Sequence, residues 1–236
     1  MSDFPYLTEH DDFPFPPPGS ASPEGVVAMG GNLSPGMLLS AYRRGIFPWF
    51  SEGDPMLWWS PDPRCVLIPA QLHVSRSMGR LLRRGLFSIT LDTRFEEVIS
   101  SCRAARRPGL PGTWITPGML GAYAELHRLG YAHSVEAWLD GELAGGMYGV
   151  SLGSLFFGES MFTRRPNGSK AALILFVREM DRLGLDLLDC QVCSPHLDTL
   201  GARAVPRDEF LRLLHRGLQR PTRRGSWTGL LKKQLK

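Results

Sequence analysis

The sequence has 236 residues, of which 43% are hydrophobic and 21% charged, and its formal net charge is +4. This is ordinary globular composition with enough chain for a substantial core, and the modest positive charge permits an anionic partner without requiring one. Residues 1–19 are acidic and proline-rich, unlike a signal peptide, and no apolar run approaches the roughly 20 residues of a membrane span, so we expect a cytoplasmic protein.

The first quarter of the chain contains one clear helix. Residues 1–33 are rich in Pro and Gly and are expected to be mostly irregular. Ser34 and Pro35 then supply the N-cap and first-turn proline of a helix that ends at Gly45. The next segment, residues 45–64, has too many prolines for a helix and does not alternate as a strand should.

The rest of the chain mixes short apolar runs with amphipathic segments. Predicted strands cover residues 65–69, 87–92, 132–139, 142–152, 154–160 and 185–192. Predicted helices cover residues 75–84, 94–104, 117–129, 169–183 and 207–218. Local signals support them: Asp140-Gly141 is a hairpin turn, Ser75 is an N-cap, and Thr93 with Glu96 has the spacing of a capping box.

The order of elements from residue 87 is strand, two helices, three strands, helix, strand, helix. This order predicts an α/β (α+β) protein in which helices cover both faces of a mixed sheet. It is also the order of the acetyltransferase-like (GNAT) fold.

The segment GIFPWFSEGDPMLWWSPDPR contains three of the six tryptophans, Trp49, Trp58 and Trp59. Two interpretations compete. The rings either pack two parts of the protein together, which is the commoner fate of Trp, or form a platform for a flat ligand such as a nucleobase.

Polar side chains interrupt two of the predicted strands. Strict alternation places Phe157, Glu159 and Met161 on one face of the first, where a carboxylate is costly to bury without a partner. On the second, Asp189 and Gln191 share a face. An Asp beside a Gln can orient or deprotonate an amine, so this pair indicates a candidate site, with a solvated face as the alternative.

Cysteine and glycine patterns argue against several kinds of site. Four Cys in a chain this long do not suggest a disulfide framework, and Cys190 and Cys193 form a CxxC in a strand, where buried small side chains are expected rather than a redox or zinc site. In RRPNGSKAAL, Arg165 and Gly168 match only half of the loop that cradles the pyrophosphate of CoA in acetyltransferases. We therefore expect no metal and an acyl donor other than CoA.

One helix concentrates positive charge. The predicted helix 75–84 carries arginines and no acid, and neutralising phosphates with such a row of charges favours nucleic-acid binding, although a solvated charged face gives the same pattern. These arginines are Arg76, Arg80, Arg83 and Arg84.

Seven motifs, in this order, resemble the bacterial leucyl/phenylalanyl-tRNA–protein transferase family: GIFPWFSEGDPMLWWSPDPR, GTWITP, AYAELHRLGYAHSVE, GELAGGMYGV, FFGESMF, SKAAL and LDCQV. The resemblance covers roughly residues 25–211. It implies a small N-terminal domain, residues 1–64, followed by a GNAT-like catalytic domain, residues 65–236. It implies an enzyme that moves Leu or Phe, and Met less well, from aminoacyl-tRNA to the α-amino group of proteins that begin with Arg or Lys. That transfer marks the acceptor for degradation by the N-end rule.

The resemblance also implies a substrate-binding site. The residues implied to hold the terminal adenosine are Trp49 and Trp114, supported by Tyr42 and Tyr123. The residues implied to surround the donor side chain are Met147, Phe156, Gly158, Met161, Phe176 and Leu188. A flexible Met-lined pocket accepts both Leu and Phe.

Three further residues carry the implied chemistry. Asp189 and Gln191 match the catalytic pair, in which Asp189 acts through Gln191 to deprotonate or orient the acceptor amine. Glu159 matches the carboxylate that recognises the basic N-terminus of the acceptor. The arginines of helix 75–84 would contact the tRNA backbone, and the expected enzyme is a monomer without cofactor.

Two regions depart from the family pattern. The loop over residues 104–112 is longer, and the tail after residue 215 is basic, so it either adds non-specific tRNA affinity or is disordered; we expect disorder. Two other hypotheses remain open: an acetyl-CoA-dependent N-acetyltransferase on the same fold, and a tRNA-binding module without catalysis.

Overall fold

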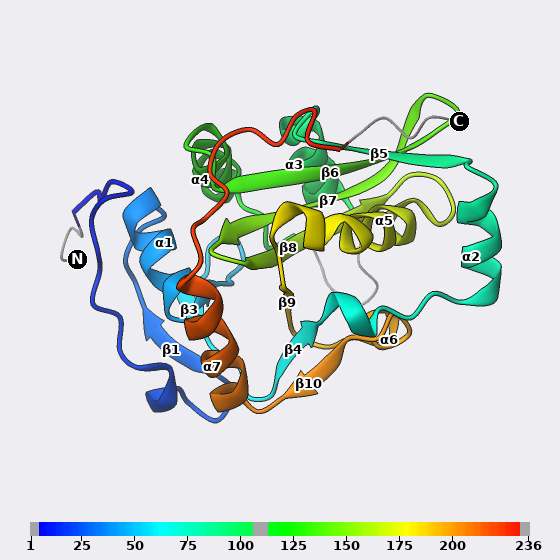
Figure 1. Cartoon of the computed structure of the whole chain (residues 1–236). Coiled ribbons are helices and arrows are strands. Elements are labelled where there is room, and N and C mark those ends of the chain that lie inside the picture. The colour runs from blue at the N-terminus through cyan, green and yellow to red at the C-terminus, as the bar shows by residue number, and fades with distance from the viewer. Residues whose placement is uncertain (1–4, 106–112, 232–236) are drawn as a thin grey trace.

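A small sheet gathers the N-terminal strands in the computed structural model, which describes residues 5–105 and 113–231 (Figure 1). Its strands are β1 (Val26–Met29), β2 (Phe47–Pro48) and β3 (Leu57–Trp59), antiparallel in the order β1-β3-β2. The helix α1 (Pro35–Arg43) connects β1 to β2 and is buried along most of its length. The loop 104–112 falls largely outside the described residues.

These short strands correct one expectation. Residues 5–33 are mostly irregular, as expected, although β1 lies among them, whereas the Trp-rich segment, which was not expected to form a strand, contains β2 and β3. Strands of two to four residues are too short for alternation to show, and β3 pairs with the distant β1.

A seven-stranded sheet forms the centre of the protein, in the order β10-β4-β9-β8-β7-β6-β5. Its strands are β4 (Arg64–Leu67), β5 (Phe87–Leu91), β6 (Ala132–Leu139), β7 (Glu142–Leu152), β8 (Leu155–Thr163), β9 (Leu187–Gln191) and β10 (Arg203–Val205). Only the β8–β9 pair is parallel, so the sheet is mixed as predicted. The sequence analysis missed β10, which has three residues and pairs with β4 at the sheet edge.

The predicted helices are all present. They are α2 (Arg76–Arg83), α3 (Phe95–Ala104), α4 (Pro117–Arg128), α5 (Gly168–Leu183) and α7 (Arg207–Leu218), to which the structure adds α6 (Pro195–Asp198) and two 3-10 turns, η1 (Pro18–Ser20) and η2 (Pro69–Gln71). The predicted α/β architecture, a small N-terminal part followed by a mixed sheet flanked by helices, is confirmed.

Consecutive glycines of β7 show that helices cover both faces. A Cβ at Gly145 would lie 2.6 Å from the backbone of Gly168, at the start of α5, whereas a Cβ at Gly146 would point toward Val98 of α3. Since successive residues of a strand face opposite sides, α5 and α3 lie on opposite faces. We call these the α5 face and the α3 face.

Each face has its own hydrophobic cluster. On β8 and β9, Phe157 and Leu187 belong to the α3-face cluster with residues of α1, α3, α4 and α7. Their neighbours Phe156 and Leu188 belong to the α5-face cluster with residues of α2 and α5. The predicted alternation of β9 is therefore confirmed where it carries Asp189.

A bulge changes the alternation of β8. Residues 148 and 149 of β7 pair with residues 160 and 158 of β8, which leaves Glu159 as an extra residue. Strict alternation put Phe157 and Met161 on one face, and this is wrong, because after the bulge Met161 packs on the α5 face. Bulges that re-aim side chains are common beside active sites.

Local capping follows the sequence only in part, and the side chain of Ser34, the predicted N-cap of α1, forms no capping hydrogen bond. Ser75 and Thr116 each accept a hydrogen bond from the amide three residues on, at 3.3 and 3.2 Å. The capping box predicted for Thr93 and Glu96 is wrong. The Thr93 hydroxyl instead donates to the buried carboxylate of Glu136 at 2.8 Å, because burying that charge demands donors.

The cysteines also differ from expectation. Cys65 of β4 and Cys193, just after β9, form a disulfide, whereas Cys102 and Cys190 are free. The expectation that none of the four is bonded is wrong for this pair. The two residues are 128 positions apart and meet because β4 pairs with β9, which spacing along the chain does not reveal.

The C-terminal segment is ordered. Residues 219–231, which we call the strap, leave α7 and run past α4 and β6 toward β5, in red in Figure 1. Trp227 is only 1% exposed, and Arg220 and Arg224 form ion pairs with acidic side chains of the body. The expectation of a disordered tail is wrong for the strap, because it supplies a core residue.

Two kinds of feature are absent from the described residues, namely a membrane-spanning helix and a cluster of metal-binding side chains. No helix within residues 5–105 and 113–231 has the length and apolar character to cross a membrane. In the same part of the chain, no group of three or more His, Cys, Asp or Glu is placed to hold a metal ion.

Candidate active site

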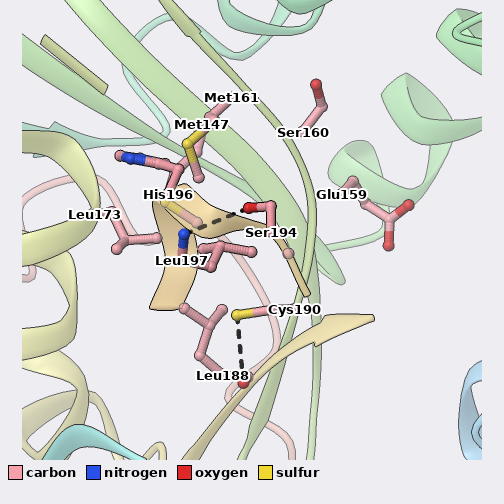
Figure 2. A pocket seen from close by; sticks show the side chains of 11 residues that line it. Met147, Glu159, Ser160, Met161, Leu173, Leu188, Cys190, Ser194, His196 and Leu197 are labelled. Carbon is pink, nitrogen blue, oxygen red and sulfur yellow. Dashed lines mark hydrogen bonds between the residues drawn. The ribbon is translucent and has the colours of Figure 1, made fainter. Parts of the chain in front are cut away.

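An apolar cavity of about 260 Å³ lies on the α5 face of the central sheet (Figure 2). Four residues of the predicted donor pocket line it: Met147, Gly158, Met161 and Leu188. The other lining residues are Glu159, Ser160, Leu173, Cys190, Ser194, His196 and Leu197. Side chains of Met and Leu therefore dominate its wall.

The cavity lies where two strands separate. The parallel pairing of β8 with β9 stops at Phe157 and Asp189. The next residues along each strand, Gly158 and Cys190, both line the cavity. A ligand in the cavity thus reaches the gap between the strands. Glu159 is also a lining residue, but its carboxylate points away from the cavity's apolar side chains in Figure 2.

Two predicted pocket residues are not among those that line the cavity. Phe156 and Phe176 are fully buried on the α5 face, with ring centroids 4.7 Å apart. Leu173 lies one helical turn before Phe176 and does line the cavity. The sequence analysis missed Leu173, although its spacing of three from Phe176 was the available signal.

Asp189 is held in a buried ion pair. Arg64 donates from Nε to Oδ1 of Asp189 at 2.8 Å and from Nη2 to Oδ2 at 2.7 Å, and neither side chain is more than 1% exposed. The guanidinium also lies over the rings of Phe47 and Phe210, at 4.7 and 4.5 Å, and donates to the carbonyl of Gly45. These contacts offset the cost of desolvating the pair.

Arg64 is a site residue that the sequence analysis did not find. It stands at the start of β4, just after a proline-rich turn, and its neighbours in sequence give no sign that it is buried. Its partner Asp189 is 125 positions away. The one available sequence signal was the charge of Arg64 itself, directly before the apolar residues of β4.

Gln191 connects Asp189 to Glu159. Its backbone N–H donates to Oδ1 of Asp189 at 2.9 Å, and its side-chain Nε2 donates to Oε1 of Glu159 at 3.0 Å. Gln191 has φ of +62°, a left-handed conformation that is uncommon for a residue other than Gly. The hydrogen bond that the Gln191 backbone donates to Asp189 therefore holds a turn that aims the side-chain amide at Glu159.

Two tyrosines complete the polar chain. Tyr123 donates its hydroxyl to Oε2 of Glu159 at 2.9 Å, and the hydroxyls of Tyr42 and Tyr123 are 2.6 Å apart. Both tyrosines are fully buried, so neither ring offers a face to an adenine. The structure places them as supports of Glu159.

The buried surroundings shift the ionisation of this chain. Burial is the main cause that raises the pKa of Glu159 to about 7, and repulsion from Asp189 acts in the same direction. Hydrogen bonds from Tyr42, Tyr123 and Gln191 act in the opposite direction and lower the pKa. Burial, followed by the charge of Glu159, raises the pKa of both tyrosines well above 10, so they stay protonated donors at neutral pH.

The tryptophans divide between packing and exposure. Trp58 is buried and donates its indole N–H to the carbonyl of Gly30 at 2.7 Å, while Trp59 packs on the same cluster. Trp49 is 40% exposed, with its ring 5.6 Å from that of Trp59, and Trp114 is half-buried against the α3-face cluster. Both interpretations of the Trp-rich segment therefore have residues to support them.

The basic helix forms a positively charged surface. All four predicted arginines of this region are exposed, and Arg76, Arg80 and Arg83 line a surface hollow of about 440 Å³ with Arg178 of α5. Within the described chain, none of these guanidinium groups forms an ion pair, so they remain available to an anion.

Comparison with known proteins agrees with the motifs. A sequence profile described as "Leucyl/phenylalanyl-tRNA protein transferase" matches residues 66–215, and the profile of that family's N-terminal domain matches residues 31–62. A GCN5-related N-acetyltransferase from Kribbella flavida aligns structurally over 72% of this chain and 61% of its own, at 12% identity and a TM-score of 0.38, and no conclusion rests on it.

Two relatives are similar along almost the whole chain. Both are named leucyl/phenylalanyl-tRNA–protein transferase. The protein from Anaeromyxobacter sp. (strain Fw109-5) is 56% identical over 90% of this chain and 91% of its own, and that from Myxococcus xanthus is 54% identical over 93% and 94%. The chain belongs to the leucyl/phenylalanyl-tRNA–protein transferase family.

Proposed function

We propose that this protein transfers Leu or Phe, and Met less well, from aminoacyl-tRNA to the α-amino group of proteins that begin with Arg or Lys. The observation that carries the proposal is the Met- and Leu-lined cavity at the separation of β8 and β9, with Glu159 at its rim. An apolar pocket beside a single buried, hydrogen-bonded carboxylate suits an apolar acyl group and a cationic amine.

The donor binds through its side chain and its terminal adenosine. The side chain of Leu or Phe enters the cavity, where Met147 and Met161 adapt to either shape. Polar side chains are rejected because they would be buried without partners. The exposed ring of Trp49, with Trp114, stacks on the adenine, and base–aromatic stacking contributes about 1–3 kcal/mol per base.

The acceptor binds through its basic N-terminus. Glu159 recognises the positive charge, and the hydrogen bonds from Tyr123 and Gln191 fix the direction of its carboxylate. A pKa of about 7 also suits Glu159 to take a proton from an α-ammonium, whose own pKa is about 7.7–8.0.

The transfer needs little activation of the donor, because an aminoacyl ester is already reactive. The neutral amine nitrogen attacks the ester carbonyl carbon, a C–N bond forms, and the C–O bond to the tRNA breaks. Glu159 first releases the ammonium proton to solvent, then accepts the second proton lost by nitrogen and passes it to the departing ribose oxygen. Asp189 serves here as an orienting group for Gln191, because Arg64 occupies both of its oxygens. Positioning supplies most of the rate.

The arginines of α2 give the tRNA a second point of attachment. Their exposed guanidiniums around the hollow suit backbone phosphates, which carry affinity without sequence preference. We place the reaction in the cytoplasm, where charged tRNA is used, with the enzyme acting as a monomer and without a cofactor. Leu or Phe at the new N-terminus marks the acceptor for the N-end rule.

Label transfer tests the proposal. Radiolabelled Phe-tRNA is mixed with the protein and with two peptides that differ only in Arg or Ala at the first position. We expect label on the Arg peptide alone, and loss of most of it with Trp49→Ala. If neither peptide is labelled while the protein still binds tRNA, the protein is a tRNA-binding module and not a transferase. If CoA raises the melting temperature in a thermal-shift assay, the protein is instead an acetyltransferase.

A further inference from the structure

The strap inserts the side chain of Trp227 into the hydrophobic cluster of the α5 face, which also contains residues of the cavity wall. The family profile stops at residue 215, yet Trp227 is 1% exposed and belongs to the α5-face cluster with Met147 and Leu188 of the cavity wall. Trp227 therefore lies beyond the residues that the family profile matches, and the reaction proposed above assigns no role to its side chain.

Backbone bonds fix the position of this indole. The N–H of Trp227 donates to Oδ2 of Asp92 at 2.7 Å, and Asp92 also accepts from His133 Nδ1 and the amide of Ser134, both at 2.9 Å. The indole N–H donates to the carbonyl of Arg223 at 3.0 Å. The ring is thus held from both its backbone and its edge.

The strap is tied to the body on the way to Trp227. The hydroxyl of Thr222 accepts from the amide of Gly153 at 2.8 Å, and Arg223 donates to the carbonyl of Leu183. Gly225 passes against Gly130, where a Cβ would lie 2.3 Å from backbone. Such closely spaced attachments leave the indole little freedom to shift.

The faces of the indole contact the aromatic wall. One stacks on the imidazole of His133, with centroids 3.7 Å apart and planes 7° from parallel. Phe156 and Phe176 lie at 6.0 and 6.4 Å, and these two rings touch each other at 4.7 Å. Trp227 therefore packs against the two phenylalanines, and each of these neighbours a cavity-lining residue: Phe156 pairs with Leu188, and Phe176 lies one helical turn after Leu173.

We propose that Trp227 is a positioning residue that sets the depth of the donor side-chain cavity by holding Phe156 and Phe176 in place. The inference rests on the proposed function, since it concerns the choice between donors. Protein interiors are close-packed, so rings with no neighbour behind them relax into the space. Removal of the indole would deepen the cavity and favour the larger donor, Phe, over Leu.

The test compares kcat/KM for Phe-tRNA and Leu-tRNA with one Arg-initiated peptide. Trp227→Ala is expected to raise the Phe/Leu ratio about tenfold, the scale on which hydrophobic pockets discriminate by size. Trp227→Phe, which refills most of the space, is expected to bring the ratio back within about twofold of the parent's. Selectivity for Arg over Ala peptides is expected to stay unchanged in both.

A matched control separates this role from general stability. Trp58 is equally buried and also donates its indole N–H to a backbone carbonyl, but it lies in the small sheet. Trp58→Ala is expected to lower the melting temperature without changing the Phe/Leu ratio. If Trp227→Ala does not fold, Trp227→Leu takes its place, with a smaller rise in the same direction.

Two negative results have different meanings. A Phe/Leu ratio that stays within twofold of the parent's in Trp227→Ala or Trp227→Leu, while transfer continues, would overturn the role of Trp227 and leave the proposed function intact. Absence of transfer by the unmodified protein, with either donor, would instead remove the function on which the inference rests.

Discussion

Glu159 is the residue at which recognition and proton transfer meet. The residue lines the cavity, and its carboxylate receives hydrogen bonds from Tyr123 and Gln191. A group that titrates near neutral pH in such a place controls both the charge offered to the acceptor and the proton it can take.

The raised pKa of Glu159 gives a signed prediction for stability. Its pKa is about 7 in the folded protein against 4.5 ordinarily, so between these values the folded state keeps a proton that the unfolded state has lost. The contribution of Glu159 to the free energy of unfolding therefore falls by on the order of 3 kcal/mol as the pH rises from about 4.5 to 7. Above about pH 7 this contribution is constant. Thermal melts of Glu159→Gln against the parent are expected to show an advantage for the variant that grows from pH 5 to pH 8.

The same residue predicts a pH dependence of rate. In the parent, transfer is expected to rise through about pH 7 as the carboxylate forms, and Glu159→Gln is expected to be slow and to lack this rise. A Glu159→Gln enzyme with the parent's pH profile would show that another group receives the proton.

The buried pair of Arg64 and Asp189 predicts a separation of stability from activity. Arg64→Met alone leaves an unpaired buried charge and is expected to cost about 3–5 kcal/mol in urea unfolding. The double variant Arg64→Met/Asp189→Leu removes both charges and is expected to recover most of that loss. It is expected to stay inactive, because Gln191 loses the acceptor for its backbone. Full activity in the double variant would show that Asp189 does not position Gln191.

At the scale of elements, α2 is a separable tRNA contact. Replacement of Arg76, Arg80 and Arg83 by Gln is expected to flatten the dependence of log affinity on log salt by about two units, since each phosphate contact contributes roughly 0.7–0.9. Filter binding at several salt concentrations measures the slope. Arg128→Gln, an exposed arginine of α4 paired with Glu125, serves as the control and is expected to leave the slope unchanged.

The disulfide joins β4 to the segment that follows β9. Cys65 pairs in register with Gln191, so the bond closes over the turn that aims this side chain. Closing a loop of 128 residues is expected to stabilise the protein by about 4–5 kcal/mol in the chain-entropy model. Urea unfolding with and without reductant measures this, and alkylation of the unfolded, unreduced chain is expected to modify two cysteines. Modification of all four would show that the thiols are free.

Elements with local signals were predictable, and those that depend on distant partners were not. Pro35 and Pro117 mark helix starts that the structure keeps. In contrast, β10 forms through its pairing with β4. The Thr93 hydroxyl donates to Glu136 instead of capping the following helix. Propensity and spacing report neither event, because both are decided by tertiary packing.

The site divides in the same way. Met147, Gly158, Met161 and Leu188, which the family resemblance assigned to the donor pocket, line the cavity, and Asp189 shares a chain of contacts with Gln191 and Glu159. Arg64 could not be found, because its significance depends on a partner across the sheet. The bulge at Glu159 also escaped, since one extra residue reverses alternation without any mark in the sequence.

For the whole molecule, the position of β4 determines how the active site is assembled. This strand follows the small sheet in the chain, yet it pairs with β9 and β10. Arg64 and Asp189 are separated by 125 residues. The chain therefore loses the entropy of closing a very long loop before their contact can stabilise the fold. Sheets built from such non-local pairings fold slowly. On refolding from denaturant, catalytic competence should therefore be the last property to return, well after helical signal, with the chain passing through helical but inactive species.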